Sequence, residues 1–132
     1  MGATLGYWLA AVDTRIAALA QLCCFADIGA LIDAGAHDLH GIYMTVPGLL
    51  DIASSGEIAG LVAPRPQLVC IGDLDPLTPP VAVDKGLAQA SAAYAQVGAA
   101  AALSVHREAA TGHQESPAMR VAVLDFFRQA LA

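Results

Sequence analysis

Apolar and polar positions near the start of the chain fall into two kinds of segment. Residues 1–12 are apolar at nearly every position and contain no breaker after Gly6, which predicts a buried helix that ends at Asp13. Residues 16–25 form a short, continuous apolar run between polar residues. Such a run is typical of a strand that is covered on both faces, as in a parallel sheet. The chain is therefore predicted to begin with a helix followed by a strand.

The next segment, residues 26–62, has no clear period. It contains two of the four histidines and is interrupted repeatedly by glycine and by Pro47. We expect a connecting excursion of short helices here, the last of them at residues 57–62 and stopped by Pro64 and Pro66.

The clearest pattern follows this excursion. Residues 67–71 are rich in strand formers and lead into Gly72-Asp-Leu-Asp-Pro-Leu-Thr-Pro-Pro80, whose prolines cannot donate to a sheet. A strand is therefore predicted at 67–71. Pro80 suits the first turn of a helix that runs to about Val97, with Gly98 as its stop.

One more strand and one more helix complete the pattern. Residues 102–106 are predicted to form a strand and 111–115 a loop. Pro117 opens a helix whose apolar residues repeat at helical spacing, at Val121, Leu124, Phe127 and Leu131. The order strand, helix, strand, helix implies parallel strands joined by right-handed crossovers. We therefore predict an α/β fold of about three parallel strands flanked by helices, in a single domain over residues 1–132.

Composition leaves one question open. The 132 residues suffice for one domain with a core but are few for a complete α/β enzyme. Hydrophobic residues make up 57% of the chain, against roughly 45–50% in an ordinary soluble protein. Either the alanine bias inflates this share, or apolar surface that another chain or domain covers is uncovered here.

Charge and cysteine content exclude several classes. The net charge of −6 and the scattered basic residues argue against a nucleic-acid partner, which requires cations to neutralise phosphate. No apolar run approaches the roughly 18–20 residues that span a membrane, and no signal peptide is expected. The three cysteines, two of them adjacent, form neither a disulfide framework nor a spaced metal site. We expect a cytoplasmic protein without a cofactor.

Chemistry concentrates where the predicted strands end. Asp73 and Asp75 follow the strand at 67–71, and His113 follows the next strand along the chain. The carboxyl ends of parallel strands share one edge of the sheet, so these loops are neighbours. An aspartate that holds one histidine nitrogen, with the other nitrogen facing a nucleophile, is the arrangement of triad catalysis.

These two loops resemble the acid loop and the histidine loop of α/β-hydrolases. Ala63-Pro-Arg-Pro66 and the segment 33–43 are similar to the dienelactone hydrolase and acetyl xylan esterase branch of that superfamily. The resemblance covers the whole chain and matches the C-terminal half of the family. It therefore implies a partial fold that lacks the N-terminal half of the sheet.

By this resemblance Asp75 takes the acid position and His113 that of the general base. Asp73 suits the acid position less well, because the family pattern has two residues between the glycine and the aspartate. The resemblance implies a carboxylic-ester hydrolase that acts on a small ester.

The chain departs from the family at the nucleophile. Family members carry a Gly-x-Ser-x-Gly elbow, whereas this chain opens with Met1-Gly2-Ala3-Thr4, which is similar to the tail of an elbow that reads Ser-Met-Gly-Ala. The serine would be the residue directly before Met1. The backbone N–H of Met1 would be the one remaining oxyanion donor. We therefore expect weak or partner-dependent activity.

Several residues have competing interpretations. Asp75 could be a turn former beside Pro76, and His113 a surface residue of its loop. Ser104 and Ser116 could be considered as replacement nucleophiles, but neither lies on an elbow.

A metal site and a reactive thiol are the remaining alternatives. His37 and His40 could share a helix face beside Asp38, but no third ligand is set by the spacing. Cys23 and Cys24 end the predicted strand and are expected to be small core residues rather than a nucleophile.

A second function belongs to a different class. Without the N-terminal half of the fold, the strand at 16–25 would be a sheet edge and the helix at 1–12 would be uncovered on one side. Such edges pair with other chains, and a symmetric dimer is the commonest outcome. The alternative to an esterase is thus an inactive half-fold that acts as an assembly or binding module, and we expect a homodimer.

Overall fold

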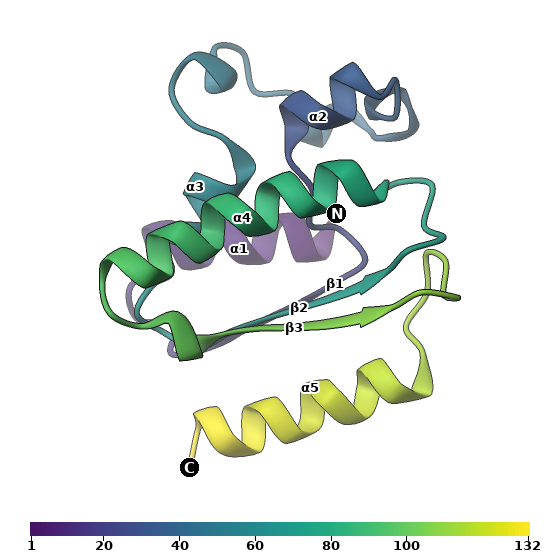
Figure 1. The fold of residues 1–132 in the computed structure, drawn as a ribbon. Coiled ribbons are helices and arrows are strands. Elements are labelled where there is room, and N and C mark those ends of the chain that lie inside the picture. Colours follow the sequence, from purple (N-terminus) through teal and green to yellow (C-terminus); the bar gives the residue numbers. More distant parts are fainter.

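A three-stranded parallel sheet forms the centre of the computed structural model, which describes residues 1–132 (Figure 1). Its strands are β1 (Leu19–Leu22), β2 (Gln67–Gly72) and β3 (Leu103–Glu108), in the order β1-β2-β3. Leu19 lies opposite Gln67, which in turn lies opposite Leu103. The predicted α/β fold of three parallel strands is confirmed.

Helices cover both faces of this sheet. One face carries α1 (Gly2–Val12), α3 (Ser55–Gly60) and α4 (Pro80–Gln96), and the other carries α5 (Pro117–Ala130) alone (Figure 1). None of the helices has the length and apolar character needed to cross a membrane.

The first part of the excursion between β1 and β2, residues 28–51, stands above α4 in Figure 1. The whole excursion consists of α2 (Ile28–Asp33), three short 3-10 turns at residues 37–39, 42–44 and 49–51, and α3. Asp27 caps α2 by accepting a hydrogen bond from the backbone N–H of Ala30.

Side chains of the central strand, β2, pack into two separate hydrophobic cores, one on each face of the sheet. Every residue of β2 is buried, and successive side chains of a strand point to opposite faces. Val69 and Ile71 join the larger core under α1, α3 and α4, where Tyr7 and Phe25 meet edge to face with ring centroids 5.8 Å apart. On the other face Leu68 and Cys70 pack with Cys23 and Met119. Burial on both faces explains the continuous apolar run at this strand.

Two elements begin or end at residues other than those predicted, and the structure shows the reason for each. The strand expected at 16–25 spans only Leu19–Leu22, and Cys23 directly after it has a φ of 55°, a conformation that does not continue a strand. The helix expected at 57–62 begins earlier, at Ser55. Ser54 and Glu57 form a reciprocal capping box at its start.

The last helix begins at Pro117 as predicted but packs on a different stripe. Met119, Val123 and Phe126 face the sheet, whereas Val121, Leu124 and Leu131 are exposed. Helix α5 therefore carries two apolar stripes, and the sequence period alone does not show which of them is covered.

Candidate active site

Asp75 and His113 meet at the carboxyl edge of the sheet. Asp75 lies in the loop after β2 and His113 in the loop after β3, and His113 Nδ1 is 2.7 Å from Asp75 Oδ2. The aspartate is 2% exposed, whereas the histidine side chain is 51% exposed. A carboxylate at this distance accepts from the ring, so in the neutral imidazole it favours the tautomer with the proton on Nδ1, which leaves the lone pair of Nε2 free. The two residues singled out from the sequence are thus brought together.

The acid loop orients Asp75 through its own backbone. The second carboxylate oxygen, Oδ1, accepts a hydrogen bond of 2.9 Å from the backbone N–H of Leu77. The backbone of Asp75 donates to the carbonyl of Gly72 and accepts from the N–H of Thr78, at 3.2 Å each. Both carboxylate oxygens therefore have partners, as a buried charge requires.

Gly72 lets the acid loop and the histidine loop touch. A β-carbon at this position would lie 2.2 Å from the carbonyl oxygen of Thr111, which no side chain can tolerate. Leu74 N–H donates to the same carbonyl over 3.0 Å, and Asp73 N–H donates to the carbonyl of Glu108 over 2.9 Å. The main chains of the two loops are thus joined directly.

Glu108, the last residue of β3, holds the histidine loop through its side chain. Its carboxylate accepts hydrogen bonds from Ser116 Oγ, from Thr111 Oγ1 at 2.6 Å and from His106 Nε2 at 2.9 Å. These three hydrogen bonds, that of Ser116 foremost, lower the pKa of Glu108 to about 2. Sequence reasoning missed this residue. The N-cap signal of Ser116 before Pro117 could have drawn attention to the loop end.

Asp73, the alternative acid, points elsewhere. Its carboxylate pairs with the guanidinium of Arg107, which also pairs with Asp84 on α4. Arg107 thus ties β3 to the loop after β2 and to α4, and of the two aspartates only Asp75 contacts His113.

The other candidate nucleophiles are bonded to neighbours, exposed on a strand or buried as thiols. Ser116 bonds Glu108 and caps α5, and Ser104 is exposed within β3. Cys23 Sγ donates to the carbonyl of Gln114 over 3.3 Å, and burial raises its pKa. Burial raises the pKa of Cys24 to about 12, so this thiol stays protonated.

The residues considered as metal ligands do not converge. His37 Nε2 pairs with Asp38 Oδ1 at 3.1 Å, whereas His40 Nε2 lies 2.8 Å from the carbonyl oxygen of Leu77. No group of three or more His, Cys, Asp or Glu side chains is arranged to hold a metal ion.

Met1 lies directly before α1, at the end of the sheet toward which the strands point (Figure 1). Thr4 in the first turn of this helix is buried, and its hydroxyl lies 3.9 Å from Met44 Sδ. An oxyanion role for the Met1 N–H stays a prediction.

No protein-family profile matches the chain. The protein called "Putative hydrolase YtaP" of Bacillus subtilis (strain 168) is 40% identical over 129 residues, which is 98% of this chain and 43% of that protein. Among solved structures, Methylesterase BT1017 is similar with a TM-score of 0.71 and 26% identity. The match covers 98% of this chain and 28% of that one.

Glucuronoyl esterases have the same fold. The enzyme from Solibacter usitatus aligns with a TM-score of 0.73 at 15% identity, and the one from Caldicellulosiruptor kristjansonii with 0.70 at 18% identity. Each match covers 98% of this chain and 40% of the esterase.

The chain thus spans less than half the length of each of these relatives. The predicted absence of part of the hydrolase sheet agrees with this coverage. The narrower resemblance to dienelactone hydrolases and acetyl xylan esterases stays a prediction. Sheet topology, loop order and these similarities together show that the chain has a partial α/β-hydrolase fold and is similar to a putative hydrolase and to esterases.

Proposed function

We propose that Asp75 and His113 act as acid and general base in the hydrolysis of a small carboxylic ester. The observation that carries this proposal is the 2.7 Å contact between a buried carboxylate and an imidazole whose other nitrogen is free. His113 Nε2 would remove a proton from the attacking oxygen as that oxygen adds to the ester carbonyl. Asp75 would stabilise the imidazolium, which then returns the proton to the leaving alkoxide.

The mechanism also requires a nucleophile that supplies the attacking oxygen. The 132 residues contain no Gly-x-Ser-x-Gly elbow. We therefore propose water as the nucleophile for this chain alone, or a hydroxyl supplied by a partner. General-base assistance by itself contributes roughly 10²–10⁴-fold in rate, so the activity we expect is weak.

A p-nitrophenyl acetate assay tests this proposal. We expect His113→Ala to lower the rate above buffer by at least about tenfold, because the base is lost. Gln114→Ala is the matched control, since Gln114 is exposed in the same loop and its side chain has no hydrogen-bond partner. Adding Asp75→Asn to His113→Ala should lower the rate little further, because the effects of mutating residues that act as one catalytic unit are not additive.

Exposed imidazoles also cleave activated esters slowly, so the single Asp75→Asn variant is decisive. If the proposal holds, this variant loses most of the His113-dependent rate, because the imidazole is then held in the wrong tautomer. Equal rates for the wild type and His113→Ala would remove the catalytic proposal for this polypeptide.

An assembly role is the second candidate, and the outer face of α1 favours it. Met1, Leu5, Leu9 and Val12 are each more than half exposed and recur on one side of the helix. Beside them β1 pairs only with β2, so its other edge is free. We propose a homodimer through β1 and α1. Monodisperse monomer in sedimentation velocity at micromolar concentration would contradict it.

We propose a cytoplasmic location. All three cysteines are free thiols, which is typical of proteins in a reducing compartment. A reporter fusion that locates to another compartment would contradict this assignment.

A further inference from the structure

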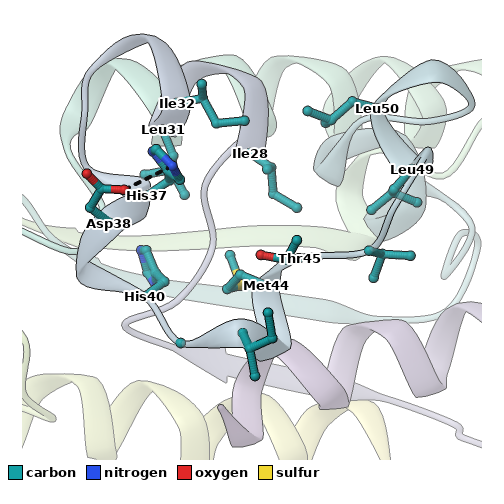
Figure 2. A pocket seen from close by; sticks show the side chains of 13 residues that line it. Ile28, Leu31, Ile32, His37, Asp38, His40, Met44, Thr45, Leu49 and Leu50 are labelled. Carbon is teal, nitrogen blue, oxygen red and sulfur yellow. Dashed lines mark ion pairs between the residues drawn. The ribbon is translucent and has the colours of Figure 1, made fainter.

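A cavity of about 510 Å³ lies within the excursion between β1 and β2. Figure 2 shows Ile28, Leu31 and Ile32 of α2 on one side of this space and Leu49 and Leu50 of the last 3-10 turn on another. Its volume lies within the range of ordinary small-molecule sites.

The lining of the cavity is mostly apolar, and three of its four polar side chains, those of His37, Asp38 and His40, already have partners. Eight of its thirteen lining residues are hydrophobic, and no lysine or arginine is among the thirteen. His37 pairs with Asp38, as the dashed line in Figure 2 marks. His40 is engaged by the Leu77 carbonyl. A ligand with many hydroxyls or a carboxylate would therefore lose its hydration without replacement partners.

Two contacts connect the wall of this cavity to the candidate active site. His40 Nε2 lies 2.8 Å from the Leu77 carbonyl oxygen, and the Leu77 N–H donates to Asp75 Oδ1. Met44, another residue of the lining, contacts the hydroxyl of Thr4 at the start of α1 through its Sδ. The cavity thus adjoins both the acid loop and the helix that begins at the same edge of the sheet.

We propose that this cavity binds a neutral alkyl group, which is the acyl or alcohol part of the ester that the site hydrolyses. The assignment of this group to a substrate rests on the proposed esterase function. The chemical class follows from the lining: a flexible aliphatic chain fills an apolar space, whereas a sugar acid would leave its polar groups unpaired. Plain aliphatic alcohols carry the same neutral alkyl chain but no ester bond, so they can serve as unreactive probes of the cavity.

Binding is measured by ¹H–¹⁵N NMR titration of the chain with 1-butanol, 1-hexanol and 1-octanol. We expect Kd to fall about tenfold for each added pair of methylenes until the space is filled, with shifts centred on residues 28–50. Sodium octanoate and methyl glucuronate should bind more weakly than 1-octanol, because neither lysine nor arginine lines the cavity and few of its polar side chains are free.

Leu50→Asn should weaken the binding of 1-octanol at least about fivefold, because it places an amide in the apolar wall. Leu124→Asn is the matched control: Leu124 is 51% exposed and Leu50 49% exposed, but Leu124 lies on α5, away from the cavity. Thr45→Trp, which should fill the space from an exposed position, is a second variant in case Leu50→Asn does not fold. Equal octanol affinity in the wild type and in both cavity variants would overturn the proposal, and so would tighter binding of methyl glucuronate.

The experiments test the proposed esterase function and the proposed alkyl site separately. His113→Ala should bind 1-octanol as the wild type does, because the alcohol requires no base. In the wild type kcat/KM for p-nitrophenyl acyl esters should rise with acyl length, and Leu50→Asn should flatten that rise. Octanol binding without His113-dependent hydrolysis refutes the esterase but keeps the alkyl site. His113-dependent hydrolysis without a chain-length effect or octanol binding refutes the cavity assignment alone.

Discussion

Single side chains hold the histidine loop in place, and Glu108 is the clearest of them. Its carboxylate ties the end of β3 to Thr111 and Ser116, which lie on either side of His113 in the chain. The direction of the nearby imidazole therefore depends on a residue that has no contact with it. We propose that Glu108 is a positioning residue, which restricts the loop so that His113 stays beside Asp75.

Glu108→Gln should destabilise the protein in a pH-dependent way. The pKa of Glu108 is lowered to about 2 in the folded state from its ordinary value of 4.5. A lowered pKa adds stability above the unfolded value, and that stability is lost as pH falls through the folded one. The difference in urea midpoint between the wild type and Glu108→Gln should thus be full at pH 7 and shrink between about pH 4.5 and pH 2.

Circular dichroism during urea unfolding at several pH values measures this difference. Glu115→Gln is the matched control, because Glu115 lies in the same loop and pairs only with Arg120 at the surface. A midpoint difference for Glu108→Gln that is absent at pH 7, or constant with pH, would show that the anchor is not electrostatic.

At the scale of elements, Arg65 binds three backbone carbonyls that lie at least 49 positions earlier in the chain. Its guanidinium donates to the carbonyl of Ala10 at 2.7 Å, of Asp13 at 3.1 Å and of Ile16 at 2.9 Å. These oxygens lie at the end of α1 and in the link to β1, where helix carbonyls have no partner of their own. The motif Ala63-Pro-Arg-Pro66, which from the sequence is only a point of resemblance, thus has a structural reason.

Arg65→Met should lower the free energy of unfolding by about 2–3 kcal/mol, because it leaves partly buried carbonyls without a charged donor. Methionine keeps the apolar stem of the side chain, so the loss reports the hydrogen bonds. Arg15→Met is the control. Arg15 forms a surface pair with Asp13, is 89% exposed and should cost less than about 1 kcal/mol. Similar losses for both variants in chemical unfolding would contradict the role of Arg65.

At the scale of the whole molecule, the chain exposes apolar surface on two sides. The outer stripe of α1 lies beside the free edge of β1, whereas Val121 and Leu124 of α5 lie on the opposite face of the sheet. Both stripes help to explain the high apolar content, so the alanine bias is not its sole cause. The α1 stripe is the proposed interface because an unpaired strand edge adjoins it.

Leu9→Lys should therefore shift the chain from dimer to monomer in sedimentation velocity, because it places a charge in the centre of the proposed interface. We expect the apparent dissociation constant to rise at least about tenfold, which corresponds to about 1.4 kcal/mol. Val121→Lys, on the exposed stripe of α5, should leave the dimer intact. The reverse result would move the interface to α5.

Local sequence patterns accounted for the order of the helices and strands, the parallel sheet, and the loops that carry Asp75 and His113. These features depend on residues a few positions apart, such as the buried run at 67–71 and the prolines after it. That His113 is near Asp75 also followed, because parallel strands bring their carboxyl ends to one edge. The single-domain assignment and the roles of these two residues stay predictions.

Only the tertiary structure decided which surfaces are covered and which side chains hold the site. The covered stripe of α5, the anchor at Glu108 and the bonds of Arg65 all depend on residues far apart in sequence. The cavity at residues 28–50 likewise arises from how short turns pack on α2. Periodicity shows that a residue is apolar but not what it contacts, because contact depends on the packing of all elements together.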